Sequence, residues 1–406
     1  MVECIIDEGK SFITITLLEA GGLSNKIVFK DSLRLFPTSL DNLCNIFSVS
    51  SESTGKLIKY NPKFNDVTLF SNPVIWGLFK KYALQDAIAL YKALLTAQIM
   101  YFNNFKVDIT TVYSNATLSL KIFRSKFLNT SIPILSKEID KFIRDAYYGG
   151  GTDYYKAYAK DLKYYDVNSL YPTAMMKPMP VNLIKFHKNM VGINLTDFFG
   201  YIEVEVNCPS TMLKPVLPFK FEDKTIYPTG TWRATYFSEE IKAMLPLGYK
   251  FKLIKGYEFS KVNLFNNYVD HFYKIKNNSI GVQKAIAKLH LNGLYGYFGR
   301  RQDLIETVNV SNSKLNYFLT TRIVKEVLEI NNNYSTLLLA SNINPSTLIK
   351  LNVICNSNIK SPTKFVMSNV AIAAAVTAYA RIHMLPYKTM SGTVYTDTDS
   401  IFTTDI

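Results

Sequence analysis

The sequence predicts a protein of the α+β class, because strand-like and helix-like stretches occur in separate blocks along the chain. Runs of β-branched and aromatic residues lie in the first 50 residues and again between residues 181 and 260. Apolar residues spaced three and four apart predict helices over residues 73–99 and 264–297. A helix rich in small residues and a short β-hairpin are expected near the C-terminal end.

Composition and charge indicate a folded protein with a polyanionic partner. The chain has 406 residues, of which 48% are hydrophobic, too many for a disordered protein. This length predicts two or three domains or subdomains. Lys and Arg number 46 against 32 Asp and Glu, which gives a formal net charge of +14. The excess favours nucleic acid or an anionic membrane surface and does not distinguish them.

Several classes of protein are disfavoured. The four cysteines form no CxxC pair and the four histidines show no ligand spacing, so neither a disulfide scaffold nor a zinc site is expected. The apolar uncharged stretch at residues 365–380 is shorter than the ~20 apolar residues that span a bilayer. The N-terminal sequence MVECIIDEGK resembles neither a signal peptide nor a transit peptide.

The N-terminal elements are expected to be strands followed by one long helix. Residues 11–18 (SFITITLL) alternate, and the Gly21-Gly22 pair separates them from a second apolar run, KIVFK. The helix is expected over residues 73–99. A polar stretch rich in Asn, Ser and Thr follows at residues 103–130.

A domain boundary is expected just before residue 146, where a segment rich in tyrosine and glycine begins. Beyond it, GYIEVEV at residues 200–206 predicts a strand. A helical hairpin follows, with helices over about 264–276 and 282–297 and a break at Asn277-Asn278-Ser279. Residues 300–362 form a polar insert without predicted structure.

The most informative motif is YTDTDS, residues 395–400. It lies between two β-prone runs, so a hairpin is expected whose turn presents Asp397 and Asp399. Two carboxylates this close raise each other's pKa unless a cation holds them ionised, and oxygen ligands of this kind suit Mg²⁺. The alternative is a solvated turn, since Asp, Thr and Ser favour turns.

A third carboxylate, Asp166, ends a strand-like aromatic stretch at DVNSLYP, residues 166–172. It is either an ordinary turn residue or the carboxylate that bridges two ions in two-metal phosphoryl transfer.

One face of the helix KAIAKLHLNGLYGYFGR is polar. At 100° per residue an arc of about 80° contains Lys284, Lys288, Asn292 and Tyr295. Such a stripe is either a solvated basic face or a clamp for a triphosphate, to which Lys276 would add a third charge.

DVNSLYP, KLHLNGLYG and YTDTDS, in this order, resemble motifs A, B and C of the family B DNA polymerases. The similarity is strongest to the protein-primed branch of linear phage genomes and of linear plasmids in fungal and plant mitochondria. The resemblance implies an α+β fold with a right-hand polymerase palm and fingers, preceded by a partial ribonuclease-H-like 3′–5′ exonuclease domain. It also implies a mitochondrial location, which the abundance of Lys, Asn, Ile, Tyr and Phe favours as a sign of AT-rich coding DNA.

The resemblance assigns roles to particular residues. Asp166 and Asp399 would hold two Mg²⁺ ions, with Asp397 in support. Tyr171 would also exclude a 2′-hydroxyl. The residues expected to bind the incoming nucleotide are Tyr171, Lys276, Lys284, Lys288, Asn292, Tyr295 and Gly296.

DNA contacts are expected in two segments. YYGG at residues 147–150 resembles the YxGG segment of the branch, so Tyr147, Gly149 and Gly150 would touch template DNA. DSLRLFP resembles a single-strand-binding segment of the exonuclease domain, with Ser32 and Leu33 as its contacts.

The exonuclease-like part has an incomplete metal site. Tyr82 and Asp86 resemble the third exonuclease motif, YxxxD, with an ordinary helix surface as the alternative. No DxE or NxxxD motif is found, so proofreading is not expected. Motif B has Gly293 where Ser is usual, which lowers helix stability by about 1 kcal/mol. The sequence ends seven residues after Asp399, so the KxY segment and the thumb of the family are expected outside it.

The resemblance divides the chain into functional regions. These are residues 1–145 (partial exonuclease), 146–180 (palm with YxGG and motif A), 181–262 (palm with a first terminal-protein-type insertion), 263–299 (fingers), 300–362 (second insertion) and 363–406 (palm with motif C).

The sequence therefore predicts a DNA-directed DNA polymerase that acts in protein-primed replication of a linear plasmid or genome. Its partners would be a DNA template-primer, deoxynucleoside triphosphates and a terminal protein. The alternative is a truncated, catalytically inactive remnant that binds DNA through its basic surface. A membrane-surface protein has only the net charge in its favour, so no membrane partner is expected.

Overall fold

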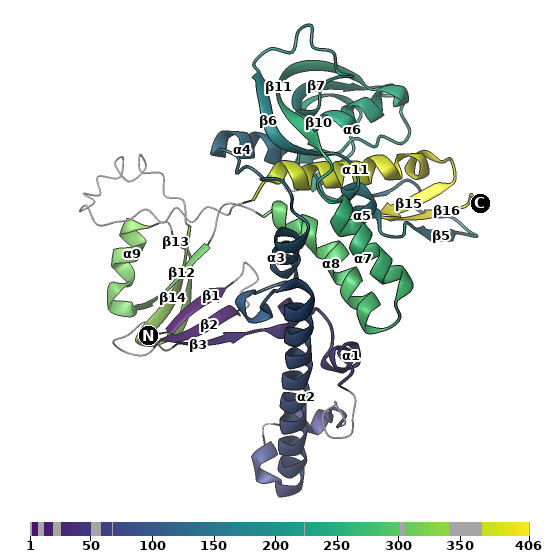
Figure 1. Ribbon diagram of the computed structural model, residues 1–406. Helices are drawn as coiled ribbons and strands as arrows, with labels where there is room; N and C mark the ends of the chain where they lie inside the picture. Colours follow the sequence, from purple (N-terminus) through teal and green to yellow (C-terminus); the bar gives the residue numbers. More distant parts are fainter. Residues whose placement is uncertain are drawn as a thin grey trace. The chain divides into compact units, whose positions relative to one another are not determined.

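The computed structural model describes residues 2–6, 12–18, 26–49, 58–66, 68–222, 224–300, 305–322, 324–340 and 368–405. The chain forms two compact units. Unit 1 comprises Met1–Leu118 and Arg301–Met367, and unit 2 comprises Ser119–Arg300 and Ser368–Ile406. Helices and antiparallel sheets occur in both units, which confirms the predicted α+β class (Figure 1).

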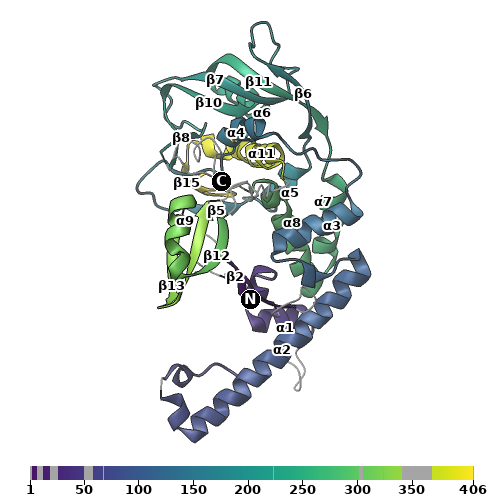
Figure 2. The same cartoon turned by 90° about the vertical axis from the view of Figure 1, so that its left-hand side faces the viewer.

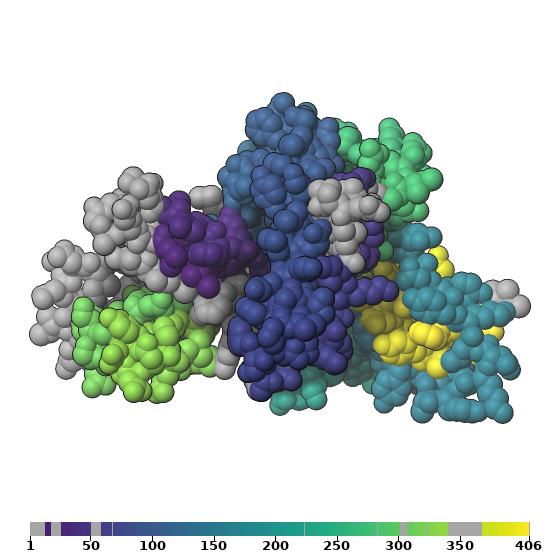
Figure 3. Space-filling view, turned by 90° about the horizontal axis from the view of Figure 1, so that it is seen from below, coloured from purple at the N-terminus to yellow at the C-terminus, as the bar shows by residue number. Residues whose placement is uncertain are grey.

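Unit 1 contains a three-stranded antiparallel sheet and the longest helix. Its first elements are β1 (Val2–Ile6), β2 (Phe12–Leu18), β3 (Lys26–Lys30), α1 (Leu40–Ile46) and α2 (Pro73–Phe105). Asn72 caps α2 by accepting a hydrogen bond from the amide of Ile75, and Lys106 ends it in the left-handed conformation. The helix thus begins where predicted and continues six residues beyond the expected end at residue 99. Its side chains form a continuous dark blue ridge in Figure 3.

A second sheet of unit 1 lies in the stretch for which the sequence predicted no structure. Its elements are β12 (Ile305–Ser311), α9 (Leu315–Thr321), β13 (Val324–Asn331) and β14 (Tyr334–Ala340), with strand order β12-β14-β13. Val310, Leu337 and Leu339 form its core. Residues 341–362 of the expected insertion lie outside the described residues.

The central sheet of unit 2 is antiparallel, with strand order β4-β15-β16-β5. Its strands are β4 (Thr152–Tyr154), β5 (Lys163–Asp166), β15 (Thr393–Asp397) and β16 (Ser400–Thr403). Two helices belong to this region, α5 (Leu170–Met175) and α11 (Val370–Thr389). The first half of α11 is fully buried, because its alanines allow α4, α5, α6 and α8 to pack closely around it.

A second four-stranded sheet in unit 2 has the order β10-β7-β11-β6 (Figure 2). Its elements are β6 (Met179–His187), β7 (Gly200–Cys208), β10 (Gly230–Phe237), α6 (Ser238–Met244) and β11 (Lys250–Val262). The strand predicted at residues 200–206 is therefore confirmed. Its inward side chains, among them Ile202, Val204 and Val206, form a core with Ile241 and Met244 of α6.

The predicted helical hairpin is confirmed as α7 (Asn266–Asn278) and α8 (Val282–Phe298). Several helices were not predicted, namely α1, α3 (Asn115–Lys126), α4 (Lys137–Asp145), α5, α6 and α9. In α3, whose sequence is largely polar, burial of Leu118, Ile122 and Phe123 supplies the stability that local propensity does not.

In the part of the chain that the structure describes, no helix has the length and apolar character needed to cross a membrane.

Candidate active site

Three carboxylates gather at one end of the β4-β15-β16-β5 sheet. Asp166 is the last residue of β5, Asp397 is the last residue of β15, and Asp399 lies in the two-residue turn before β16. Ser400 pairs with Asp397 on one side and with Asp166 on the other. The hairpin is as predicted, and its register brings the two motifs together across more than 200 residues of chain.

The clustered carboxylates at this edge of the sheet favour the binding of a cation. Burial raises the pKa of the Asp399 carboxyl, and the neighbouring carboxylates of Asp166 and Asp397 raise it further. A divalent cation bound by carboxylate oxygens would reverse that effect, so the chemistry of the donor set fits Mg²⁺. Within the described ranges, no three His, Cys, Asp or Glu side chains already stand in the positions of a metal centre.

Hydroxyl groups orient two of the carboxylates. The Thr152 hydroxyl donates to Asp397 Oδ1 at 2.9 Å, and the Thr398 hydroxyl lies 3.2 Å from the same oxygen. Tyr164 donates to Asp166 Oδ2 at 3.3 Å. A cavity of about 410 Å³ is lined in part by Asp166 and Asp399, which leaves open space beside these side chains.

The turn between β15 and β16 has an unusual backbone. Thr398 has a φ of +55°, a conformation that β-branched residues rarely adopt. Its amide donates to the carbonyl of Gly151 at 3.1 Å. The Thr398 side chain fills the space that a Cβ atom on Gly150 would need, with the nearest atom 2.6 Å away. A glycine is therefore needed at position 150, because this turn approaches it closely.

Two aromatic rings join motif A to motif B. Tyr171 of α5 and Tyr295 of α8 stack with ring centroids 4.5 Å apart and planes 13° from parallel. Burial is the main cause that raises the pKa of both phenols, and Asp399 raises both further. Burial and then Tyr171 raise the pKa of Tyr147, and Tyr147 in turn contributes to the raised pKa of Tyr295. The Tyr147 ring lies against Gly299.

The predicted triphosphate ligands lie on the two helices of the hairpin. Lys284, Lys288, Asn292 and Gly296 are exposed along one face of α8, and Tyr295 is half-buried. Lys276 of α7 donates from Nζ to the Ser169 hydroxyl at 2.7 Å, directly before α5. The structure thus brings Lys276 to motif A, while Lys284 and Lys288 face solvent.

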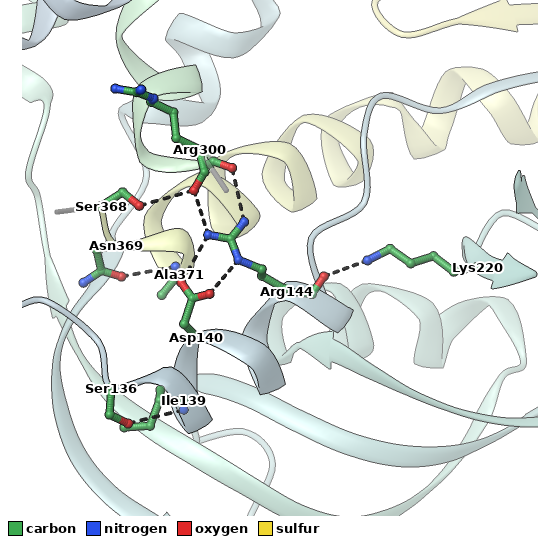
Figure 4. Close-up of polar contacts among 10 residues, drawn as sticks. Ser136, Ile139, Asp140, Arg144, Lys220, Arg300, Ser368, Asn369 and Ala371 are labelled. Carbon is green, nitrogen blue, oxygen red and sulfur yellow. Dashed lines mark hydrogen bonds and ion pairs between the residues drawn. The ribbon is translucent and has the colours of Figure 1, made fainter. Parts of the chain in front are cut away.

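Arg144 anchors the end of the motif B helix (Figure 4). Its guanidinium pairs with Asp140 one turn earlier in α4, with Nε–Oδ2 at 2.5 Å. It also donates to the carbonyls of Gly299, at 3.4 Å, and Arg300, at 2.7 Å. A cation at the C-terminal end of a helix is favourable, because the last carbonyls have no partner within the helix. Lys220 in turn donates to the carbonyl of Arg144.

The exonuclease-like residues lie in unit 1. Tyr82 and Asp86 are one turn apart on α2 and share a hydrogen bond, which raises the pKa of Tyr82. Ser32 begins a short 3₁₀ helix and lines a groove of about 800 Å³, and Leu33 is 54% exposed. The roles of these residues in an exonuclease site and in binding single-stranded DNA stay predictions.

Sequence reasoning missed the groups that support the site, chiefly Thr152, Arg144, Arg381 and Lys388. Arg381 and Lys388 lie on α11, which was predicted only as a helix of small residues. A signal was present, because these are two basic residues on a largely apolar helix, seven positions apart. Such spacing places them on one face, two turns apart.

An antiparallel sheet that carries three carboxylates at one end, beside a two-helix unit with exposed lysines, offers the types of group that metal-assisted phosphoryl transfer uses. Residues 4–393 match the family described as DNA polymerase type B, organellar and viral. The chain belongs to this family, which confirms the resemblance seen in its motifs.

Relatives and solved structures agree with this assignment. A probable DNA polymerase of Podospora anserina is 35% identical over 93% of this chain, and one of Neurospora intermedia is 32% identical over 92%. The chain covers 35% and 42% of the lengths of these two relatives. The fold is similar to that of Phi29 DNA polymerase complexed with primer-template DNA and incoming nucleotide substrates. That similarity has a TM-score of 0.69 at 21% identity and covers all of this chain and 66% of the other.

Proposed function

We propose that this chain carries the nucleotidyl-transfer centre of a DNA-directed DNA polymerase that replicates a linear plasmid or genome by protein priming. The observation that carries the proposal is the register of Ser400 between Asp397 and Asp166, which gathers the carboxylates of motifs A and C at one edge. The raised pKa of Asp399 supports a site made for cations. The family membership supports the reaction type.

In the proposed site each group has a distinct task. Asp166 and Asp399 hold two Mg²⁺ ions, and Asp397 supports them through its bond to Thr152. When bound, the ions activate the primer hydroxyl and neutralise the phosphates of the leaving group. The positive charges of the three lysines on α7 and α8 offset the negative charge of the triphosphate. The substrate is thereby held for in-line attack of the primer hydroxyl on the α-phosphate, with release of pyrophosphate.

The stacked tyrosines would form the floor and wall of the nucleotide pocket. Tyr171 lies at the start of α5, so its ring would pack under the sugar and exclude a 2′-hydroxyl. Tyr295, Asn292 and Gly296 follow one another along α8 and would line the new base pair. Tyr147, Gly149 and Gly150 would contact the template strand.

The partners follow from the same proposal. The net charge of +14 favours a polyanion, and the structures similar in fold include a polymerase bound to primer-template DNA. A terminal protein would supply the first hydroxyl, and the location would be the mitochondrion.

Labelling with a radioactive deoxynucleotide tests priming. A label that stays with a protein after denaturation supports it, and a label found only on DNA contradicts it.

Primer extension tests the central proposal. The 406-residue chain is incubated with a template-primer, deoxynucleoside triphosphates and Mg²⁺. We expect extension by the unaltered chain and a loss of at least about a thousandfold in Asp399→Asn, since one of the carboxylates proposed to hold the ions is removed. Asp197→Asn makes the same chemical change in an exposed loop and serves as the matched control.

A second measurement separates metal binding from catalysis. We expect Mg²⁺ to raise the melting temperature of the unaltered chain and of Asp197→Asn, because binding to the folded state alone stabilises it. Asp399→Asn should show a much smaller increase. If the unaltered chain extends no primer, or if Asp399→Asn extends primers as well as the control, the proposal is wrong for this chain.

A further inference from the structure

Two buried cations on α11 hold a short segment of backbone that reaches the catalytic turn. We name residues 148–151 the strap, since they run from α4 towards β4. Arg381 and Lys388 are two helical turns apart, so they lie on one face of α11. Their side chains are only 4% and 3% exposed. A charged group is rarely buried to this extent without a structural partner.

Arg381 connects the strap to α6. Its Nη1 donates to the carbonyls of Tyr148 and Gly149 at 2.8 and 2.9 Å. Its Nε and Nη2 donate to the two carboxylate oxygens of Glu240, at 2.7 and 2.8 Å, and Glu240 is fully buried. Two parallel hydrogen bonds to one carboxylate fix the orientation of a guanidinium. The Nη1 group of Arg381 is therefore held towards the strap in one geometry.

Lys388 holds the last residue of the strap. Its Nζ donates to the carbonyl of Gly151 at 3.1 Å and lies 5.4 Å from the centre of the Tyr227 ring. Burial and, less strongly, the nearby Arg381 lower the pKa of the ammonium to about 8, although Asp153 and Glu240 act in the opposite direction. The protein therefore keeps this cation in an unfavourable position, where its hydrogen bond goes to the strap.

The strap and the next residue contact the turn at three successive positions. The side chain of Thr398 lies against Gly150, and its amide donates to the same Gly151 carbonyl that Lys388 binds. Thr152 then donates to Asp397. A displacement of the strap would therefore move both residues that precede Asp399.

We propose that Arg381 and Lys388 are positioning residues for the catalytic turn, because they fix the carbonyls of the strap. Thr398 donates to one of these carbonyls, and Asp397 is held by Thr152, the residue that follows the strap. Neither side chain touches the reacting atoms in this arrangement. They act through the strap, and the strap sets the direction in which Asp399 points. The role of the turn in binding metal and nucleotide rests on the proposed function. The mechanical connection from α11 to Thr398 does not.

Hydrogen–deuterium exchange tests the mechanical connection without any need for activity. In Lys388→Met the donor is lost and the side-chain volume is nearly kept. We expect amide exchange in peptides that cover Thr398 to become at least tenfold faster, with no change in β7 and β11. Lys242→Met is the matched control, because Lys242 also donates to two backbone carbonyls, those of Thr196 and Phe198, but in another part of unit 2.

Two further variants keep the test decisive. Lys388→Arg retains a cation and a donor, so exchange at Thr398 should return towards the rate of the unaltered chain. Thr152→Val removes only an exposed hydroxyl, so this variant should fold normally. It breaks the hydrogen bond to Asp397 without any change on α11 and therefore tests the connection to the turn separately. Unchanged exchange at Thr398 in Lys388→Met, or equally faster exchange in β7 and β11, would overturn the proposal.

Metal affinity provides the second readout. Binding of Mn²⁺, followed by electron paramagnetic resonance, should weaken about tenfold in Lys388→Met and in Thr152→Val and stay unchanged in Lys242→Met. Equal affinity in all four proteins contradicts a positioning role. If the unaltered chain itself binds no Mn²⁺, the proposed function fails, while the exchange result still decides whether Lys388 holds the turn.

Discussion

The ring of Tyr171 lies parallel to the ring of Tyr295, with their centres 4.5 Å apart. The first residue follows Asp166 by five positions and the second belongs to the helix that carries Lys284 and Lys288. This stack is therefore a direct contact between motif A and the helix that is proposed to bind the triphosphate.

Removal of one ring should weaken nucleotide binding more than it slows chemistry. Stacked aromatic pairs contribute about 0.5–1.5 kcal/mol beyond their buried area. We expect Tyr295→Ala to raise KM for deoxynucleoside triphosphates about tenfold, with a smaller change in kcat, in steady-state primer extension. Tyr295→Phe keeps the stack and should stay within about twofold of the unaltered chain. A loss confined to kcat in Tyr295→Ala would contradict this role for the stack.

Gly296 is expected to separate stability from function. A Cβ atom at this position meets no atom within 4 Å, and the residue lies inside α8. Replacement of an exposed helical glycine by alanine stabilises a helix by about 1 kcal/mol. Gly296→Ala should therefore raise the melting temperature yet lower kcat/KM for incorporation, because the new methyl group occupies space intended for the base pair. Equal or better incorporation by this stabler variant would show that no ligand approaches Gly296.

A methyl group at Gly150 should instead destabilise the protein, because a side chain of the protein itself occupies the space beside this residue. Gly150→Ala places a methyl group within 3.0 Å of the Thr398 side chain, and we expect a loss of about 1–3 kcal/mol in the free energy of unfolding. Thr398→Gly removes the obstructing atoms and suits a φ of +55°. The double variant should recover most of the loss, as measured by chemical denaturation in a double-mutant cycle.

Gly149→Ala provides the control for that cycle. No atom lies within 4 Å of a Cβ at Gly149, so its effect on unfolding should be under about 0.5 kcal/mol. A similar loss of stability at both glycines would show that the close approach of Thr398 is not the cause.

His290 should make the hairpin of α7 and α8 sensitive to acid. The ring is fully buried, its Nδ1 lies 2.9 Å from the Ser119 hydroxyl, and burial lowers its pKa to about 3. The unfolded chain binds a proton near pH 6.5, whereas the folded chain does so only near pH 3. The stability that depends on neutral His290 is therefore complete above pH 6.5 and is lost as the pH falls towards 3, by up to about 5 kcal/mol.

Chemical denaturation at pH 7 and pH 4.5 measures this effect. His290→Gln cannot titrate, so it should be less stable than the unaltered chain at pH 7 but should lose less stability on acidification. His383→Gln, at an exposed position of α11, should follow the unaltered chain at both values. The same acid dependence in all three proteins would exclude His290 as its source.

The sequence alone determined the elements with a strong local signal. The alternation of β2 and β7, the periodic spacing in α7 and α8 and the turn residues of YTDTDS each describe interactions between near neighbours in the chain. The order of three short motifs was enough to indicate the family. By contrast, α3 was missed because burial by distant segments, rather than its own sequence, makes it stable. In α4 a local signal was present and was overlooked, since Ser136 caps the helix and Arg144 lies in its last turn.

Only the tertiary structure decided how the carboxylate edge is supported. Arg381 meets Glu240 across 141 residues, Lys388 meets Gly151 across 237, and Thr152 meets Asp397 across 245. No periodicity in a sequence reports a contact of this range, because side-chain hydrogen bonds depend on how separate elements pack. The sequence determined which chemical groups the site contains, and the packing of α11 against the strap determined where the turn that carries Asp399 is held.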